Sequence, residues 1–198
     1  MNKSLFSRLS GGRTKQRGIT LGETLLSMVI GGALVVGAYA FYTKANGDVR
    51  AQQTADGVNQ IITGIKDRYG ALGGFSGINN AGVIANTLVP KTFAVSGTTI
   101  NSPYGSNSAV TVAPTDGGST FTVTVTGLPT SACSVVVSRI DSATTGLGAG
   151  ATAPAEGTLA TAATATTIKA IGGALDVAKT MTQCADGGAL VQVISKAQ

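Results

Sequence analysis

The chain has 198 residues, of which 14 are basic, 9 are acidic and none is histidine. Five basic residues and no acidic ones lie in the first 18 positions, so the other basic residues balance the acidic ones. The basic charge therefore belongs to a leader and does not indicate a nucleic-acid partner, which needs a basic face on the folded part. Without histidine, a Ser-His or Cys-His nucleophile is excluded and a zinc site lacks its usual nitrogen ligands. We expect no enzyme activity, no cofactor and no metal.

Residues 19–42 form an apolar run directly after this leader, and Glu23 is its only charged side chain. A helix of 24 residues is about 36 Å long, enough to cross a hydrocarbon core of about 30 Å. Basic residues before the run place the leader in the cytoplasm and the rest of the chain outside. A lone carboxylate near the bilayer centre costs about 2.5–3.5 kcal/mol, so Glu23 needs a partner or a role.

A removable secretory signal is the alternative explanation of the apolar run. Such signals have a shorter apolar core, followed directly by a small-residue cleavage site. The nearest candidate, Ala38-Tyr39-Ala40, lies inside the run, and the first cysteine is Cys133, far too late for a lipoprotein signal. The run therefore favours a retained membrane helix.

From residue 43 to 70 the pattern predicts that the helix continues with one apolar face. The apolar positions with helical spacing are Val58, Ile61, Ile62, Ile65 and Tyr69. The polar positions between them, which suit a solvated face, are Asn59, Gln60, Lys66, Asp67 and Arg68. Gly70, Gly73 and Gly74 predict the end of the helix. Such a stripe is typical of a helix packed under a sheet.

Beyond the helix the sequence predicts a turn-rich part. Residues 71–100 have a loop-like pattern, and 101–105 contain the proline and glycine of a turn. Residues 109–113 and 120–126 alternate apolar side chains with threonine, and Asp116-Gly117-Gly118 fits a hairpin connection between them. Two antiparallel strands are expected here.

The stretch 130–140 is open between helix and strand, because Thr130 or Ser131 suits a helix cap whereas three valines from position 135 favour a strand. Residues 142–167 are rich in Ala, Thr and Gly and predict a surface excursion with little order. The expected elements after it are a strand over 167–171, a helix over 176–184 that starts at an Asp cap, and a strand over 189–195.

Cys133 and Cys184 are the two cysteines of the chain, in the part placed outside the cytoplasm. Disulfides persist in such oxidising compartments, and a chain with no histidine and no C-x-x-C does not suit zinc. We therefore predict a disulfide between them. The chain-entropy model gives such a bridge about 4 kcal/mol.

The segment from Lys15 to about Tyr69 resembles the N-terminal part of type IV pilins. The features that carry the resemblance are a basic leader ending at Gly18, a hydrophobic residue that begins a membrane-length helix, and Glu23 at the fifth place after the glycine. An 18-residue leader, and Ile19 rather than Phe as the first mature residue, are more like the type IVb branch.

The resemblance implies an α+β fold in which a long N-terminal helix, half membrane-spanning and half amphipathic, packs on a small antiparallel-sheet head with one disulfide. The divisions it implies are a cleaved basic leader (1–18), a transmembrane and filament-core helix (19–42), an amphipathic helix (43–70) and a pilin head (71–198). The disulfide would bracket the C-terminal region of that head. It also favours a helix over 130–140, because pilins often place one beside the first cysteine of the head.

The resemblance further implies how the chain is processed. A prepilin peptidase that is also an N-methyltransferase would cut between Gly18 and Ile19 and methylate the new amine of Ile19. The subunit would leave the inner membrane through an assembly platform with a motor ATPase and an outer-membrane secretin, and polymerise with itself into an extracellular filament. There Glu23 would pair with the Ile19 amine of a neighbouring subunit. Pairing within its own chain, or snorkelling to the interface, is the alternative.

The sequence is compatible with three functions. The leading one is the major subunit of a type IVb pilus, for adhesion, aggregation or conjugative contact. The second is a minor pilin or a type II secretion pseudopilin, and the third is a bitopic membrane protein with an adhesive domain. Abundance in sheared filaments separates the first two, and the mature N-terminus separates both from the third.

Overall fold

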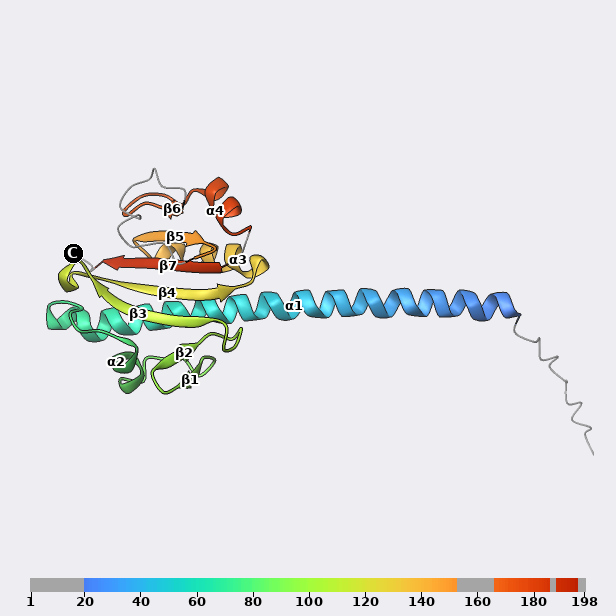
Figure 1. Ribbon diagram of the computed structural model, residues 1–198, viewed down its shortest axis with the longest axis horizontal. Coiled ribbons are helices and arrows are strands. Elements are labelled where there is room, and N and C mark those ends of the chain that lie inside the picture. The colour runs from blue at the N-terminus through green and yellow to red at the C-terminus, as the bar shows by residue number, and fades with distance from the viewer. Residues whose placement is uncertain (1–19, 153–165, 186–187, 196–198) are drawn as a thin grey trace, which may run out of the picture. The chain divides into compact units, whose positions relative to one another are not determined.

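The computed structural model describes residues 20–152, 166–185 and 188–195. The chain divides into two compact units, Met1–Tyr42 and Thr43–Gln198. The described part of the first unit is helical, and the second is an α+β head (Figure 1). One helix, α1 (Leu21–Tyr69), contributes residues to both units.

The end of α1 and its apolar face agree with the sequence prediction. Tyr69 is followed by a 3-10 turn, Gly70–Leu72, and then by Gly73, whose φ of 93° suits a residue without a side chain. The four isoleucine and valine positions of the predicted stripe are fully or almost fully buried, and Tyr69 is half-buried. The amphipathic half of α1 is therefore part of the core of the head.

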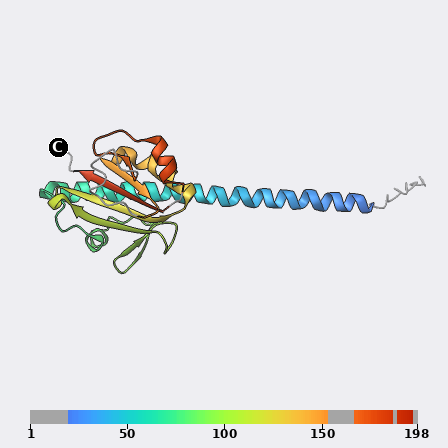
Figure 2. The ribbon, with the colours of Figure 1, turned by 45° about the horizontal axis from the view of Figure 1, so that its top comes forward.

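The strands among the described residues form one seven-stranded sheet in the order β1-β2-β3-β4-β7-β5-β6, with antiparallel pairing throughout (Figure 1; Figure 2). The strands are β1 (Ala94–Ser96), β2 (Thr99–Asn101), β3 (Ala109–Thr115), β4 (Thr120–Leu128), β5 (Gly146–Gly150), β6 (Thr167–Lys169) and β7 (Gly188–Ser195). The predicted hairpin is β3 and β4, joined by a 3-10 turn at Asp116–Gly118. The strands predicted over 167–171 and 189–195 are β6 and β7.

Shorter helices α2 (Asn80–Ala85), α3 (Thr130–Ile140) and α4 (Val177–Gln183) accompany the sheet. α3 confirms the helix expected over 130–140, but its N-cap residue is Pro129 and no side chain caps it, so the caps suggested at Thr130 or Ser131 are wrong. Asp176 caps α4 as predicted, because its carboxylate accepts a hydrogen bond from the Lys179 N–H at 3.0 Å.

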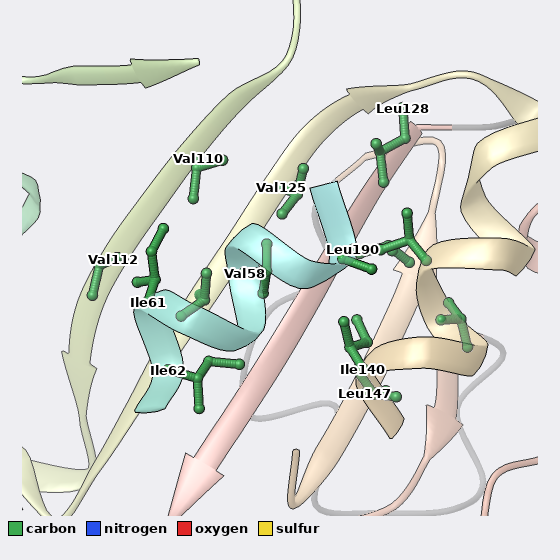
Figure 3. Packing of buried hydrophobic residues seen from close by; sticks show 14 of the residues in the cluster. Val58, Ile61, Ile62, Val110, Val112, Val125, Leu128, Ile140, Leu147 and Leu190 are labelled. Carbon is green, nitrogen blue, oxygen red and sulfur yellow. The ribbon is translucent and has the colours of Figure 1, made fainter. Parts of the chain in front are cut away.

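The hydrophobic core lies between α1 and the sheet. Figure 3 shows Val58, Ile61 and Ile62 of α1 over the strands, in one cluster with Leu190 of β7 and Ile140 of α3. A fully buried aliphatic side chain contributes about 1.5–3 kcal/mol, so this stripe is a main source of stability for the head.

The stretch 71–100 is not loop throughout, contrary to the sequence prediction, because it contains α2, β1 and β2. The Asn80 side chain fastens α2 to β3. Its Nδ2 donates to the Val110 carbonyl at 3.0 Å, and its Oδ1 accepts from the Val112 N–H at 2.8 Å. Elements this short are stabilised mainly by tertiary contacts, so no local periodicity predicts them.

β5 overturns the prediction that all of 142–167 is a surface excursion. Its residues Gly146–Gly150 are all buried, and the strand pairs with β7 on one side and β6 on the other. Glycine and alanine are poor strand formers, which hid this element in the sequence. Their small size suits the site, because a Cβ at Gly146 would lie 3.1 Å from Ile171. The remainder, 153–165, is outside the described residues.

Candidate assembly helix and disulfide region

The predicted processing residues Gly18 and Ile19 lie outside the described part of the chain, and Glu23 lies in the first turn of α1. Its Oε2 accepts hydrogen bonds from the Thr20 N–H at 3.2 Å and from the Thr20 hydroxyl at 3.4 Å. In return, the Glu23 N–H donates to the Thr20 hydroxyl at 3.4 Å. This reciprocal pattern is a capping box. This box was not among the sequence predictions, although Thr20-Leu21-Gly22-Glu23 has the T-x-x-E spacing that predicts it.

The capping box directs the Glu23 carboxylate toward the start of the helix. The first amides of a helix have no intrahelical partners and its N-terminus carries a partial positive charge, so a carboxylate is favourable there. Within the described residues, no basic side chain lies within 4 Å of Glu23, and the residue is exposed. The carboxylate can therefore accept a cation from outside this set of residues.

The apolar half of α1 is exposed on all sides. Every residue from 20 to 46 is exposed, including Leu21 at 80%, Met28 at 75% and Phe41 at 80%. In the described part of the chain, one helical stretch, Leu21–Leu72, is long and apolar enough to cross a membrane, with a mean hydropathy of 1.9 over its most apolar window. A helix that is apolar all round needs lipid or other apolar helices around it.

Small and polar residues in this exposed half also suit a water-free environment. The Thr24 hydroxyl donates to the Leu21 carbonyl at 2.8 Å, and the Ser27 hydroxyl donates to the Thr24 carbonyl at 2.9 Å. These hydroxyls are satisfied within the helix, as a hydrocarbon environment requires. At Gly31 and Gly32 a Cβ would meet nothing within 4 Å, so a neighbouring helix can approach closely there.

The predicted disulfide is present between Cys133 of α3 and Cys184 at the end of α4, with Cα atoms 5.4 Å apart. Both residues are buried, at 2% and 4% exposure. The bond fastens α3 to α4, and the loop that it closes contains β5 and β6.

A second cross-connection in the same region is the Lys169 ammonium, which the sequence analysis did not identify. Its Nζ lies 2.8 Å from Oδ1 of Asp141, and the Lys169 side chain is 12% exposed. The same Nζ donates to the backbone carbonyls of Asp141 at 2.7 Å and Thr144 at 3.0 Å. Oδ1 of Asp141 accepts no aligned hydrogen bond within the described residues, so its attraction to Lys169 is mainly Coulombic. This cluster links β6 to the end of α3 and serves structure.

The described residues contain no cluster of three or more His, Cys, Asp or Glu side chains placed to hold a metal ion. Lys169 and Asp141 are paired with each other, and the Lys169 ammonium is also occupied by two backbone carbonyls. The main features of the described residues are therefore the exposed apolar half of α1 and the disulfide-linked head.

Comparison with known proteins identifies the family. No curated protein matches the chain significantly. A family model described as PilS N terminal matches residues 48–196, which include the amphipathic half of α1 and the head but not the apolar run. This family is pilin-related, is in general structural rather than catalytic, and suggests self-association into a polymer. Since the match covers well over half of its length, the chain belongs to the PilS N-terminal family of type IV pilus-related proteins.

Proposed function

We propose that the chain is the structural subunit of a type IVb pilus, a surface filament for adhesion, aggregation or conjugative contact. The observation that carries this proposal is an apolar helical half exposed on every side, in a chain of a pilin-related family. Such a helix suits two environments in succession. It lies in the inner membrane before assembly and among the helices of neighbouring subunits afterwards.

The proposed processing follows the divisions inferred from the sequence. A prepilin peptidase and N-methyltransferase removes the leader 1–18 by cutting between Gly18 and Ile19, and methylates the Ile19 amine. Residues 19–42 then form the filament core, 43–70 support the head, and 71–198 form the outer surface. The partners are an inner-membrane platform with its motor ATPase and an outer-membrane secretin.

Specific contacts must set the register of the filament. Lipid tails are as apolar as packed helices, so transfer from membrane to filament gains little from the hydrophobic effect. Glu23 supplies a specific contact, because a buried unpaired charge costs several kcal/mol. A cation at the same axial position in the filament removes most of that cost. We propose that this cation is the Ile19 amine of an adjacent subunit. The Thr20 backbone N–H supports this role, because its hydrogen bond holds the carboxylate at the helix start.

N-terminal sequencing and intact-mass measurement of sheared filaments test the processing. We expect subunits that begin at Ile19 and carry one added methyl group, and we expect this chain to be the most abundant protein present. A subunit that retains Met1, or a cut at another bond, would rule out pilin processing. Filaments in which the chain is only a trace component would point to a minor pilin.

Substitution of Glu23 tests the assembly role separately. In Glu23→Ala the leader should still be removed, but filament yield should fall by at least tenfold. Thr20→Val is the matched control, because it removes the capping hydroxyl and retains the carboxylate, and it should leave most of the yield. Normal piliation by Glu23→Ala, or an equal loss in Thr20→Val, would contradict a pairing role for the carboxylate.

A further inference from the structure

An open pocket of about 350 Å³ lies in the head beside the first turns of α1 that follow the apolar run. It is lined by Thr43, Asn46, Gly47, Arg50, Tyr104 and Pro129. The four α1 residues follow an i, i+3, i+4, i+7 spacing and therefore share one face of the helix. The proposed pilus function assigns no role to this pocket.

The pocket wall combines a cation with hydrogen-bonding groups. Arg50 supplies a guanidinium with five N–H donors, and within the described residues no carboxylate lies within 4 Å of it. Asn46 adds an amide. The Tyr104 hydroxyl donates to the Gly47 carbonyl at 2.9 Å, which fixes the wall of the pocket opposite the helix. Planar guanidinium groups bind phosphate oxygens in pairs, so this wall suits a phosphate.

The electrostatics at Tyr104 identify which charges act on the pocket. Burial raises the pKa of the Tyr104 hydroxyl, the Arg50 charge lowers that pKa, and the Asp48 charge raises it. Arg50 and Asp48 therefore both act at the position of the Tyr104 oxygen.

The position of these residues along the chain indicates the source of the phosphate. The apolar run ends at Tyr42, and Tyr39 and Tyr42 are exposed at 69% and 67%, as aromatic residues at a membrane interface are. The head-group layer of each leaflet is about 5–7 Å thick. At about 1.5 Å per residue, the helix rises about 6 Å from Thr43 to Gly47. The Thr43 end of the helical wall therefore lies within the head-group layer when the run spans the membrane, whereas the Arg50 backbone lies about 12 Å beyond Tyr42. Helical side chains point back toward the helix N-terminus, so the long Arg50 side chain can extend its guanidinium toward this layer.

We propose that this pocket binds the phosphate-bearing head group of a membrane phospholipid, with Arg50 as the charged contact. The inference rests on the membrane-anchored stage of the proposed function and adds a ligand to it. A bound head group would fix the height and rotation of the anchored subunit at the membrane surface before it enters a filament.

Binding can be measured on the full chain in maltoside micelles, without filaments or processing enzymes. The probe is a short-chain phosphatidylethanolamine, and the readout is the backbone amide resonances of Gly47 and Tyr104. We expect saturable shifts. Arg50→Gln should weaken binding about tenfold, the change expected when a charge-assisted contact worth about 1.4 kcal/mol is lost. Arg68→Gln, an exposed arginine of the same helix outside the pocket, should have no effect.

Two further probes distinguish the sources of the ligand. Inorganic phosphate should bind much more weakly than the lipid, and a short-chain diacylglycerol, which lacks phosphate, should not shift either resonance. Equal binding of inorganic phosphate, binding of diacylglycerol, unchanged affinity in Arg50→Gln, or no saturable shift would each overturn the proposal. Since no filament is present, failure here leaves the processing and piliation tests unaffected, and failure of those tests leaves the binding result unaffected.

Discussion

Removal of the disulfide should destabilise the head substantially. The perturbation is the double variant Cys133→Ala/Cys184→Ala, which opens a loop with a sequence separation of 51. The chain-entropy model gives a loop of this size about 4 kcal/mol of stabilisation. For a domain of this size each kcal/mol corresponds to about 2–4 °C, so the melting temperature should fall by roughly 8–16 °C.

The assays are thermal melting and urea unfolding of the full chain in maltoside micelles, each followed by near-ultraviolet circular dichroism, which reports the packing of aromatic residues in the head. Reduced wild-type protein should match the double variant. Met181→Ala, an exposed change on α4 beside the bond, should shift stability by less than about 0.5 kcal/mol. A loss of less than about 1 kcal/mol in the double variant would refute the loop-entropy reasoning.

The remaining predictions concern packing, charge and pH within the head. Lys169→Met should cost about 2 kcal/mol in urea unfolding, because it leaves the Asp141 carboxylate and two carbonyls without their cation, and the partial exposure of Asp141 reduces the loss. Gly57→Ala should cost about 1–2 kcal/mol, because the new Cβ would collide with the Phe93 ring. The energetic cost of this collision should exceed the gain in helix propensity from glycine to alanine. The raised pKa of Tyr104 stabilises the fold fully below the unfolded value of about 10, and that contribution is lost as the pH rises through the folded value. The stability of wild-type protein should therefore fall above pH about 10 more steeply than that of Tyr104→Phe.

Matched controls isolate each cause. Lys91→Met removes an exposed lysine and should be nearly neutral, so an equal loss there would contradict the Lys169 reasoning. Gly47→Ala places a Cβ where nothing lies within 4 Å and should not destabilise the helix. A Gly57→Ala cost that persists in a Phe93→Leu background would exclude the ring as its cause. Parallel pH curves for wild type and Tyr104→Phe would contradict the assignment to Tyr104.

Long, periodic elements of this fold could be predicted from the sequence because their patterns are local. The stripe from Val58 to Ile65 repeats with helical spacing over about two turns, and the alternating residues of β3 and β4 flank a recognisable glycine turn. β5 could not be found this way. Its Gly-Leu-Gly-Ala-Gly sequence carries no strand signal, and what makes it a strand is the pairing with β7 and β6, distant in sequence.

The candidate sites also divide into those visible as local sequence features and those that join residues distant in sequence. The capping box of Thr20 and Glu23 was visible as a four-residue motif, and the disulfide followed from there being only two cysteines in the expected compartment. The contact between Lys169 and Asp141 joins residues 28 positions apart with no motif between them. The Arg50 pocket likewise needs Tyr104, which folding brings from a distant turn.

In the proposed filament, the disulfide would also limit how far a subunit extends under mechanical load. A filament that holds a cell against flow transmits tension through its subunits, and a head that gives way lengthens as its chain straightens. With the bond intact, the segment between Cys133 and Cys184 is bypassed. A separation of 51 residues at about 3.4 Å each corresponds to about 170 Å of polypeptide that cannot extend under load. Each intact disulfide would thus reduce the length to which a subunit of the proposed filament extends under tension.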